Sequence, residues 1–231
     1  MKKVLITGNR KGIGRFLTEK FLENGYFVVG CSRQESDLVA VNYIHMICDV
    51  NDYNNIVELF RILRKKDIYI DILINNAGIA SMNHFITTPS STSTNIFNTN
   101  FHATLNFSKY SAKMMVKKKW GRIINFSSVA VPLNLEGELS YAASKAAIES
   151  ASKIMSKELG IFGITVNCIG PNPIDTDLIR TLSKDKISDL LDKQSIKRLG
   201  KYEDIWNVVD FYISESSNFI NGQSIYLGGI C

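Results

Sequence analysis

The chain has 231 residues, with 27 Lys and Arg against 22 Asp and Glu, so its formal net charge is +5. Hydrophobic residues make up 45% and charged residues 21%, which is typical of a folded globular protein and excludes intrinsic disorder, a disulfide mini-protein and a collagen-like chain. The charge surplus is also too small to predict nucleic-acid binding, because such domains concentrate Lys and Arg into a dense patch. The length predicts a single domain over residues 1–231.

The sequence predicts neither a membrane segment nor a metal site. The apolar run from Val4 to Ile6 stops at Thr7, well short of the about 7–15 apolar residues of a signal peptide or the about 18 of a membrane span. The four cysteines form no C-x-x-C pair, and the three scattered histidines complete no zinc-type spacing. We therefore expect a cytoplasmic protein with free thiols, no metal and no membrane partner.

Apolar runs with strand character alternate with helical patterns from the first residues onward. A buried strand is expected at residues 3–6, and residues 12–24 then carry apolar side chains at helical spacing until Gly25, which is typical of a helix C-cap. The elements expected after this pair are, in chain order, strands at 27–31 and 44–48, a helix at 52–66, a strand at 70–74, a long helix at 94–117, a strand at 122–126, a second long helix at 140–159, a strand at 164–169, a helix at 203–213 and a short strand at 223–226.

This alternation over the whole length predicts the fold class. Strands separated by helices pair in parallel and are covered by helices on both faces, so the pattern is that of an α/β protein. We expect a single-domain Rossmann fold, with a doubly wound, mostly parallel, seven-stranded sheet. The segment from residue 171 to 200 is polar, basic and only weakly helical, and we interpret it as a lid over a binding site.

The first strand leads into a glycine-rich turn and then directly into a helix. Glycines at such a turn let the backbone approach a pyrophosphate, and the helix N-terminus offers free N–H groups to its charge. The spacing G-x-x-x-G-x-G differs from the common G-x-G-x-x-G, so the place of the turn after the first strand carries the prediction. The candidate cofactor-binding residues of this turn are Gly8, Asn9, Arg10, Lys11, Gly12, Ile13 and Gly14.

The end of the second strand indicates which dinucleotide binds. An acidic residue there would bind the 2′-hydroxyl of NAD, whereas the sequence has Ser32 and Arg33, which suit a 2′-phosphate. Lys11 in the glycine turn adds a second cation, so we expect NADP(H) rather than NAD(H). The alternative, that Lys11 and Arg33 are ordinary surface cations, stays open. Asp49 and Val50, after the third strand, are placed to contact the adenine.

Tyr141 and Lys145 lie four residues apart, on one face of a predicted helix. Such pairs arise by chance, but Ser128 ends a strand whose carboxyl end should lie at the same edge of the sheet. Carbonyl reduction needs a proton donor, and an ordinary tyrosine pKa near 10 is too high for efficient exchange at pH 7. We expect the Lys145 ammonium and a cationic oxidised nicotinamide to lower that pKa to about 7. A serine hydroxyl can orient the substrate oxygen.

Together these motifs resemble the short-chain dehydrogenase/reductase family, in its compact single-domain branch. Further matching segments are Asn75–Gly78, Asn100, Val166–Pro171, Thr176 and Gly222–Gln223. The resemblance implies a catalytic tetrad of Asn100, Ser128, Tyr141 and Lys145, in which Asn100 holds a water that links the lysine to solvent. It also implies cofactor contacts from Asn76, Ala77, Gly78, Tyr141, Lys145, Pro171, Ile174 and Thr176. The chain departs from the family where Asn172 replaces the usual glycine after Pro171. It also departs where only residues 34–42 connect Arg33 to the third strand, since family members often have a helix there.

The resemblance implies an NADPH-dependent enzyme that reduces a ketone to a secondary alcohol, with hydride leaving the B face of the nicotinamide. It also implies a homotetramer, with a dimer as the alternative. Apolar residues at 129–135 suit a small ketone or an acyl chain, and a sugar or steroid substrate stays open.

Two alternatives to a general ketone reductase remain open. One is a 3-oxoacyl-carrier-protein reductase, whose acidic carrier Lys117–Lys119 could hold, although Phe162 stands where a basic residue is expected. The other is a non-catalytic NADP-binding sensor on the same fold.

Overall fold

The computed structural model describes residues 1–174 and 184–230 of the chain. The strands are β1 (Lys3–Thr7), β2 (Phe27–Ser32), β3 (Tyr43–Ile47), β4 (Ile72–Asn75), β5 (Gly121–Phe126), β6 (Ile164–Gly170) and β7 (Ser224–Tyr226). The helices are α1 (Gly12–Glu23), α2 (Tyr53–Lys65), α3 (Ser90–Phe97), α4 (Ala103–Met115), α5 (Ala130–Leu133), α6 (Leu139–Gly160), α8 (Lys184–Asp192) and α9 (Tyr202–Ile213). Short 3₁₀ turns lie at Phe85–Thr87, Val116–Lys118 and Glu215–Ser217.

The seven strands form one sheet in the order β3-β2-β1-β4-β5-β6-β7, and every neighbouring pair is parallel. The predicted Rossmann-type fold is therefore confirmed, with a sheet that is parallel throughout. The chain starts at β1, builds outward to β3, and then returns to β4 on the other side of β1. Ligands of such sheets bind at the carboxyl ends of the strands where this reversal occurs.

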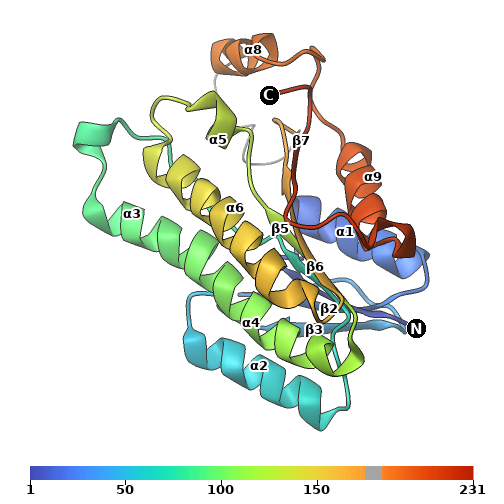
Figure 1. The fold of residues 1–231 in the computed structure, drawn as a ribbon. Helices are drawn as coiled ribbons and strands as arrows, with labels where there is room; N and C mark the ends of the chain where they lie inside the picture. The colour runs from blue at the N-terminus through green and yellow to red at the C-terminus, as the bar shows by residue number, and fades with distance from the viewer. Residues whose placement is uncertain (175–183, 231) are drawn as a thin grey trace.

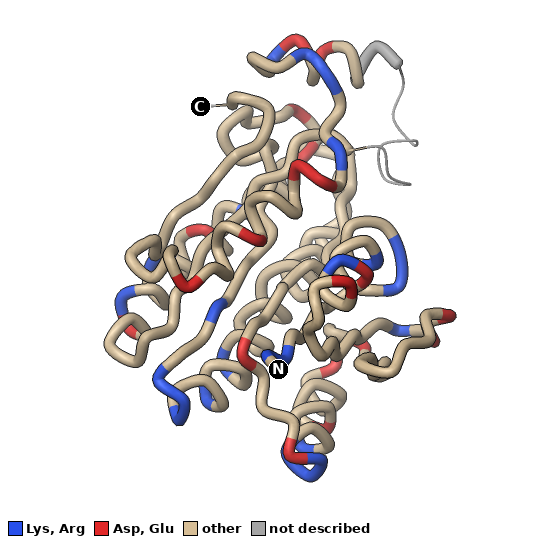
Figure 2. The backbone as a smooth tube through the Cα atoms, turned by 90° about the vertical axis from the view of Figure 1, so that its right-hand side faces the viewer, with Lys and Arg blue, Asp and Glu red and all other residues tan. Residues whose placement is uncertain are grey.

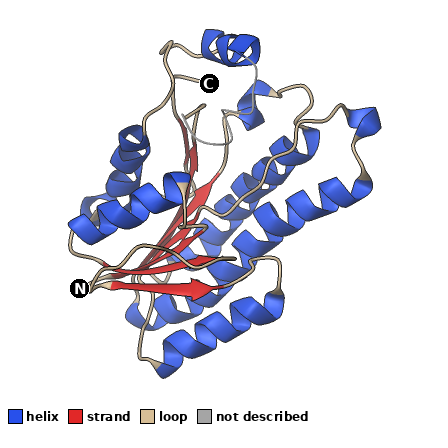
Figure 3. Ribbon diagram, turned by 180° about the vertical axis from the view of Figure 1, so that it is seen from behind, coloured by secondary structure: helices blue, strands red, loops and turns tan. Residues whose placement is uncertain are grey.

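Helices cover both faces of the sheet, as Figures 1 and 3 show. One core lies beneath α2 and α4, and the other lies beneath α1 and α9. Side chains of β1 alternate between the two, with Leu5 in the first and Val4 and Ile6 in the second. Because both faces are buried, the strand is an unbroken apolar run rather than an alternating one.

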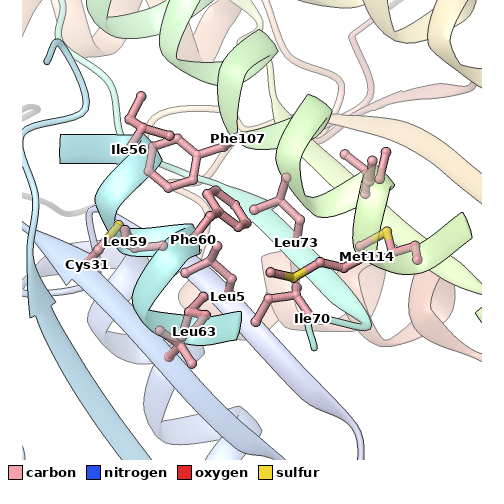
Figure 4. Packing of buried hydrophobic residues seen from close by; sticks show 14 of the residues in the cluster. Leu5, Cys31, Ile56, Leu59, Phe60, Leu63, Ile70, Leu73, Phe107 and Met114 are labelled. Atoms are coloured by element: carbon pink, nitrogen blue, oxygen red, sulfur yellow. The ribbon is translucent and has the colours of Figure 1, made fainter. Parts of the chain in front are cut away.

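The first core is built around aromatic side chains from two helices (Figure 4). The ring of Phe60 on α2 lies 5.9 Å from that of Phe107 and stacks at 5.3 Å on that of Tyr110, both on α4. Phe60 and Phe107 are fully buried. This contact fixes α2 beside α4 on one face of the sheet, where α4 packs against β4 and β5.

The long helix predicted at 94–117 is interrupted. Its first part is α3, which begins at Ser90, and its second part is α4; residues Asn98–His102 between them form a π-helical turn. A π turn inserts one residue into the helical repeat, so apolar spacing alone does not reveal it, and such turns are frequent at functional sites. This turn contains Asn100, one of the predicted catalytic residues.

Figure 2 shows acidic and basic residues interspersed along the chain. Within residues 1–174 and 184–230, no three His, Cys, Asp or Glu side chains gather as metal ligands. In the same part of the chain, no helix has both the length and the hydropathy needed to cross a bilayer.

The aromatic contact between α2 and α4 gives a prediction about stability. Phe60→Ala should lower the free energy of unfolding by about 3–5 kcal/mol, because the lost ring leaves a cavity that the sheet cannot fill. Phe219→Ala, at a fully exposed side chain, is the matched control and should change it by less than about 0.5 kcal/mol. Urea unfolding of both variants measures this, and equal losses would contradict the assigned core.

Candidate active site

The end of β1 and the end of β4 are tied together by hydrogen bonds. The Thr7 hydroxyl oxygen accepts from the backbone N–H groups of Asn76 at 3.1 Å and Ala77 at 3.0 Å. In return, Asn76 Nδ2 donates to the carbonyl oxygens of Thr7 at 3.0 Å and Gly8 at 3.1 Å. The Gly8 N–H donates to Cys31 O on β2 at 2.8 Å. The glycine turn is therefore held against the ends of both neighbouring strands.

The glycine turn has the shape of a phosphate cradle. Gly8 and Gly12 have φ values of +68° and +57°, which favour glycine. A Cβ on Gly14 would lie 2.3 Å from Gly8 O, so the helix packs directly on the turn. Within the described residues, a Cβ on Gly12 would meet no atom within 4 Å, and α1 has neither an acidic residue in its first turn nor a side-chain cap. Its N–H groups are thus oriented for an anion, which fits a dinucleotide pyrophosphate.

Asn9, predicted to contact the cofactor, directs its side chain elsewhere. The side chain is fully buried, and its Nδ2 donates to the Tyr43 hydroxyl on β3 at 2.6 Å. Only the backbone of Asn9 therefore belongs to the cradle. The next two residues, Arg10 and Lys11, have exposed side chains at its rim.

The predicted adenosine end lies at β2 and β3. The Ser32 hydroxyl donates to Gln34 O at 2.6 Å, and Arg33 is exposed beside it. Asp49 Oδ1 accepts from the N–H of Asn51 at 3.0 Å, and Val50 is buried.

Sequence reasoning missed an ion pair that closes this end of the site. Arg15, in the first turns of α1, pairs with Asp37 in the segment after β2, and also with Glu19. Hydrogen bonding to Arg15 lowers the pKa of the Asp37 carboxyl. The pair joins residues 22 positions apart, so no local spacing indicates it.

The four predicted catalytic residues come from three elements. Tyr141 and Lys145 lie in the first turns of α6, Ser128 follows β5, and Asn100 lies in the π turn. Lys145 is buried, and its Nζ donates to Phe126 O at 2.7 Å and lies 5.8 Å from the centroid of the Tyr141 ring. The structure thus brings the lysine and tyrosine together at the end of β5.

Gly78 and Asn100 join this group from the β4 side. A Cβ on Gly78 would lie 3.3 Å from Asn100 Oδ1 and 3.5 Å from Lys145 Nζ, so a glycine leaves room for both side chains. Asn100 Oδ1 accepts from Ile79 N at 2.9 Å, and its Nδ2 donates to Ile79 O and Ser144 Oγ, each at 3.0 Å. The Asn100 side chain therefore locks the loop after β4 to α6.

Burial controls the pKa values of the central pair. Burial raises the pKa of Tyr141 to about 12, which a hydrogen bond with Ser128 partly opposes and the charge of Glu138 increases. Burial lowers the pKa of Lys145 to about 8, with the neighbouring Cys168 acting in the opposite direction. The lowered tyrosine pKa that the sequence predicted is not what these residues produce by themselves. The reason is that the Lys145 ammonium is directed at Phe126 O, so loss of solvent dominates at the phenol.

The residues predicted after β6 have different positions. Pro171 O accepts from Val129 N at 3.2 Å, which links the ends of β5 and β6. Ile174 is buried in the core beneath α1 and α9 and bridges Gly200, so its side chain serves packing. Asn172, which replaces the family's usual glycine, is buried, and its Nδ2 donates to Gln194 Oε1 at 2.7 Å. Thr176 lies outside the described residues.

The loop after β4 borders a cavity of about 430 Å³. Its lining combines apolar residues with hydroxyl and amide groups: Ile79, Ala80, Ser81, Ser91, Thr92, Asn95 and Ile96. Ile79 connects this cavity to the four predicted catalytic residues, since its backbone bonds Asn100.

The apolar wall predicted at 129–135 is only partly exposed. Val129 is buried in the protein, whereas Val131 and Leu133 on α5 are half-buried.

The buried lysine gives a prediction with a pH signature. Lys145→Met should raise the free energy of unfolding at pH 7 by about 1–3 kcal/mol, because a folded-state pKa of about 8 means that burial penalises the ammonium. Between pH 8 and 10.5, Lys145 binds more protons in the unfolded chain than in the folded protein. The free energy of unfolding of the wild type therefore rises with pH in this range, and its difference from the variant narrows. Thermal unfolding across this range measures the difference. Lys157→Met, exposed on the same helix, is the control; a gain in both variants would contradict the assigned penalty.

Comparison with known proteins identifies the family. A family model described as short chain dehydrogenase matches residues 2–187. The 3-oxoacyl-(acyl-carrier-protein) reductase FabG of Buchnera aphidicola subsp. Schizaphis graminum is 33% identical over 234 residues, covering 99% of this chain and 96% of that protein. The reductase of the same name from Escherichia coli (strain K12) is also 33% identical, with the same coverage.

Solved structures share the whole fold. A structure described as a gluconate dehydrogenase from Agrobacterium tumefaciens matches with a TM-score of 0.93 and 26% identity, covering 99% of this chain and 94% of that one. A 4-hydroxyisoleucine dehydrogenase complexed with NADH matches with a TM-score of 0.90 and 28% identity, covering 99% and 98%. The chain belongs to the short chain dehydrogenase family, and it is an oxidoreductase that uses a nicotinamide cofactor to interconvert a carbonyl and its alcohol.

Proposed function

We propose that this chain is an NADPH-dependent reductase that converts a ketone into a secondary alcohol. The observation that carries the proposal is the convergence of Tyr141, Lys145 and Asn100 at the end of β5, next to the glycine turn after β1. A sensor on the same fold would not need this arrangement. The whole of residues 1–231 is proposed to act as one catalytic domain, with residues 171–200 as the lid.

The chain's own residues would handle the proton. NADPH, when bound, supplies the hydride to the carbonyl carbon. The Tyr141 hydroxyl gives its proton to the carbonyl oxygen, and the Ser128 hydroxyl donates a hydrogen bond to the same oxygen as charge develops there. The pKa of Lys145 is about 8, close enough to physiological pH for this side chain to release and regain a proton during the reaction. Asn100 holds the loop after β4 against α6 and so keeps the pocket in shape.

The cofactor preference rests on charge at the end of β2. Ser32 and Arg33 occupy the place where an acidic residue would bind the 2′-hydroxyl of NAD, and Lys11 lies in the adjacent turn. A 2′-phosphate would receive charge-assisted hydrogen bonds from both cations. The similar 4-hydroxyisoleucine dehydrogenase is complexed with NADH, which supports a nicotinamide dinucleotide in this fold.

The substrate class that the relatives support best is a 3-oxoacyl group on a carrier protein. Relatives 33% identical over 99% of this chain are named for that reaction. The cavity beside Ile79 has hydroxyl and amide groups in its lining. These groups could hydrogen-bond the amides of the arm that carries the acyl thioester. Of the residues considered for docking a carrier protein, Lys118 pairs with Asp71 at 2.5 Å at the amino end of the sheet. Phe162, which stands where a basic residue was expected, packs on the core.

Tyr141→Phe tests the reaction. With a 3-oxoacyl thioester and NADPH, the variant should lose about 10²–10⁴-fold in kcat, because the proton donor is gone while the ring remains. Consumption of NADPH measures turnover. NADPH binding by fluorescence titration is the internal control and should stay within about tenfold of wild type, the effect of one lost hydrogen bond. If wild type and variant consume NADPH equally with every carbonyl in a broad panel, the sensor alternative replaces this proposal.

We also propose a cytoplasmic homotetramer, with a dimer as the alternative. Helix α6 leaves Leu139 and Ile154 more than half exposed, and Ile161 directly after it is 83% exposed. Apolar side chains along one helix are typical of a surface that pairs with its own copy across a two-fold axis. Sedimentation at micromolar concentration should therefore give a mass near four or two times 25.9 kDa. A 25.9 kDa particle would contradict self-association.

A further inference from the structure

A continuous chain of hydrogen bonds crosses the adenosine end of the site. Asn9 Nδ2 donates to the Tyr43 hydroxyl at 2.6 Å, and that hydroxyl lies 3.1 Å from His45 Nδ1. His45 Nε2 lies 2.9 Å from Gln34 O and 3.3 Å from Ser32 Oγ. Ser32 Oγ also donates to Gln34 O at 2.6 Å. The chain thus links the glycine turn to the residue that precedes Arg33.

The sheet register explains why these groups meet. Tyr43 and His45 are two residues apart on β3, so their side chains lie on the same face, and His45 is paired with Gly30 on β2. A Cβ on Gly30 would lie 2.0 Å from Asn9 Nδ2. The glycine therefore makes room for the Asn9 side chain, which reaches across β2 to Tyr43.

The partners define where each proton lies. A carbonyl oxygen can only accept, so His45 carries a proton on Nε2 and donates it to Gln34 O. The Tyr43 oxygen accepts from Asn9 and donates its own proton to His45 Nδ1. One arrangement of protons therefore satisfies Tyr43, His45 and the Gln34 carbonyl together, which holds the imidazole in a single orientation.

This orientation matters for the Ser32 hydroxyl. To bind a 2′-phosphate, Ser32 must turn its proton away from Gln34 O and toward the anion, which only accepts. The Gln34 carbonyl stays satisfied when this happens, because His45 Nε2 still donates to it. Without His45, the same rotation would leave the carbonyl to solvent and would free the segment that carries Arg33.

The segment after β2 depends on such anchors. Within the described residues 1–174, positions 33–42 form neither helix nor strand. Arg15 on α1 holds Asp37 from one side, and His45 on β3 holds Gln34 from the other. The position of Arg33, between β2 and Gln34, follows from these contacts.

We propose that His45 is a positioning residue for recognition of the cofactor's 2′-phosphate. It holds Gln34 and frees the Ser32 proton, so it favours a dinucleotide that carries the phosphate over one that lacks it. This inference rests on the proposed NADPH preference and adds His45, with Tyr43 and Asn9 behind it, to the residues that set it.

Binding measurements on the intact protein test the proposal. We expect His45→Ala to weaken NADPH binding about three- to tenfold, the effect of one hydrogen bond, with NADH binding within about twofold of wild type. The value of kcat at saturating NADPH should not change, so the loss appears in KM alone. His45→Gln keeps an N–H donor toward Gln34 O and should recover most of the affinity.

Two further variants make the result specific. Met46→Ala, on the same strand but packed on the opposite face, should leave the ratio of NADPH to NADH affinity unchanged. Arg33→Ala tests the cofactor proposal itself and should weaken NADPH binding about tenfold or more.

The outcomes separate the two proposals. If Arg33→Ala weakens NADPH binding and His45→Ala does not, the role of His45 is wrong and the cofactor proposal stands. If Arg33→Ala leaves NADPH binding intact, the cofactor proposal fails. Equal weakening of NADPH and NADH by His45→Ala would also overturn the role given to His45.

Discussion

The hydrogen bonds between Thr7 and the backbone of Asn76 and Ala77 are the constraint on which the site depends. They span the point where the sheet reverses its order, between β1 and β4. Ligands of open α/β sheets bind in the crevice at such a reversal, where the backbone at the strand ends can line the site. Because Asn76 Nδ2 also donates to Gly8 O, the glycine turn is joined directly to the loop that carries Gly78. Cofactor and catalytic residues are thereby held in one frame.

Burial then sets the chemistry at that frame. The same loss of solvent raises the pKa of Tyr141 to about 12 and lowers that of Lys145 to about 8, so burial shifts the protonation equilibrium of each side chain toward its neutral form. A bound group that places positive charge or a hydrogen-bonding ribose beside Tyr141 and Lys145 would shift their protonation equilibria again. Burying Lys145 at the end of β5 therefore lowers the stability of the fold. Buried groups with shifted pKa values are common at catalytic sites.

The sequence predicted the strands and most helices closely because their apolar patterns are local. Gly25, for example, has a φ of +77° just after α1, as its C-cap position predicted. The prediction of one continuous helix at 94–117 was wrong, because a π turn that contains Asn100 interrupts it. There Asn100 bonds Ile79 and Ser144, and the spacing of apolar residues does not reveal such a turn. Asn9 lies within the predicted phosphate turn, yet its side chain turns toward Tyr43 on β3. That choice depends on Gly30, which leaves the space.

By itself, the sequence determined the α/β class, the place of the glycine turn and the four residues proposed as a tetrad, because short motifs and the alternation of apolar runs are properties of neighbouring positions. Only the tertiary structure decided what those residues contact: Lys145 with Phe126 O, Asn100 with Ile79, Asn172 with Gln194 and His45 with Gln34. Most of these contacts join residues far apart in the chain. They depend on strand order, register and burial, which the chain acquires only when its strands pair and its side chains leave water.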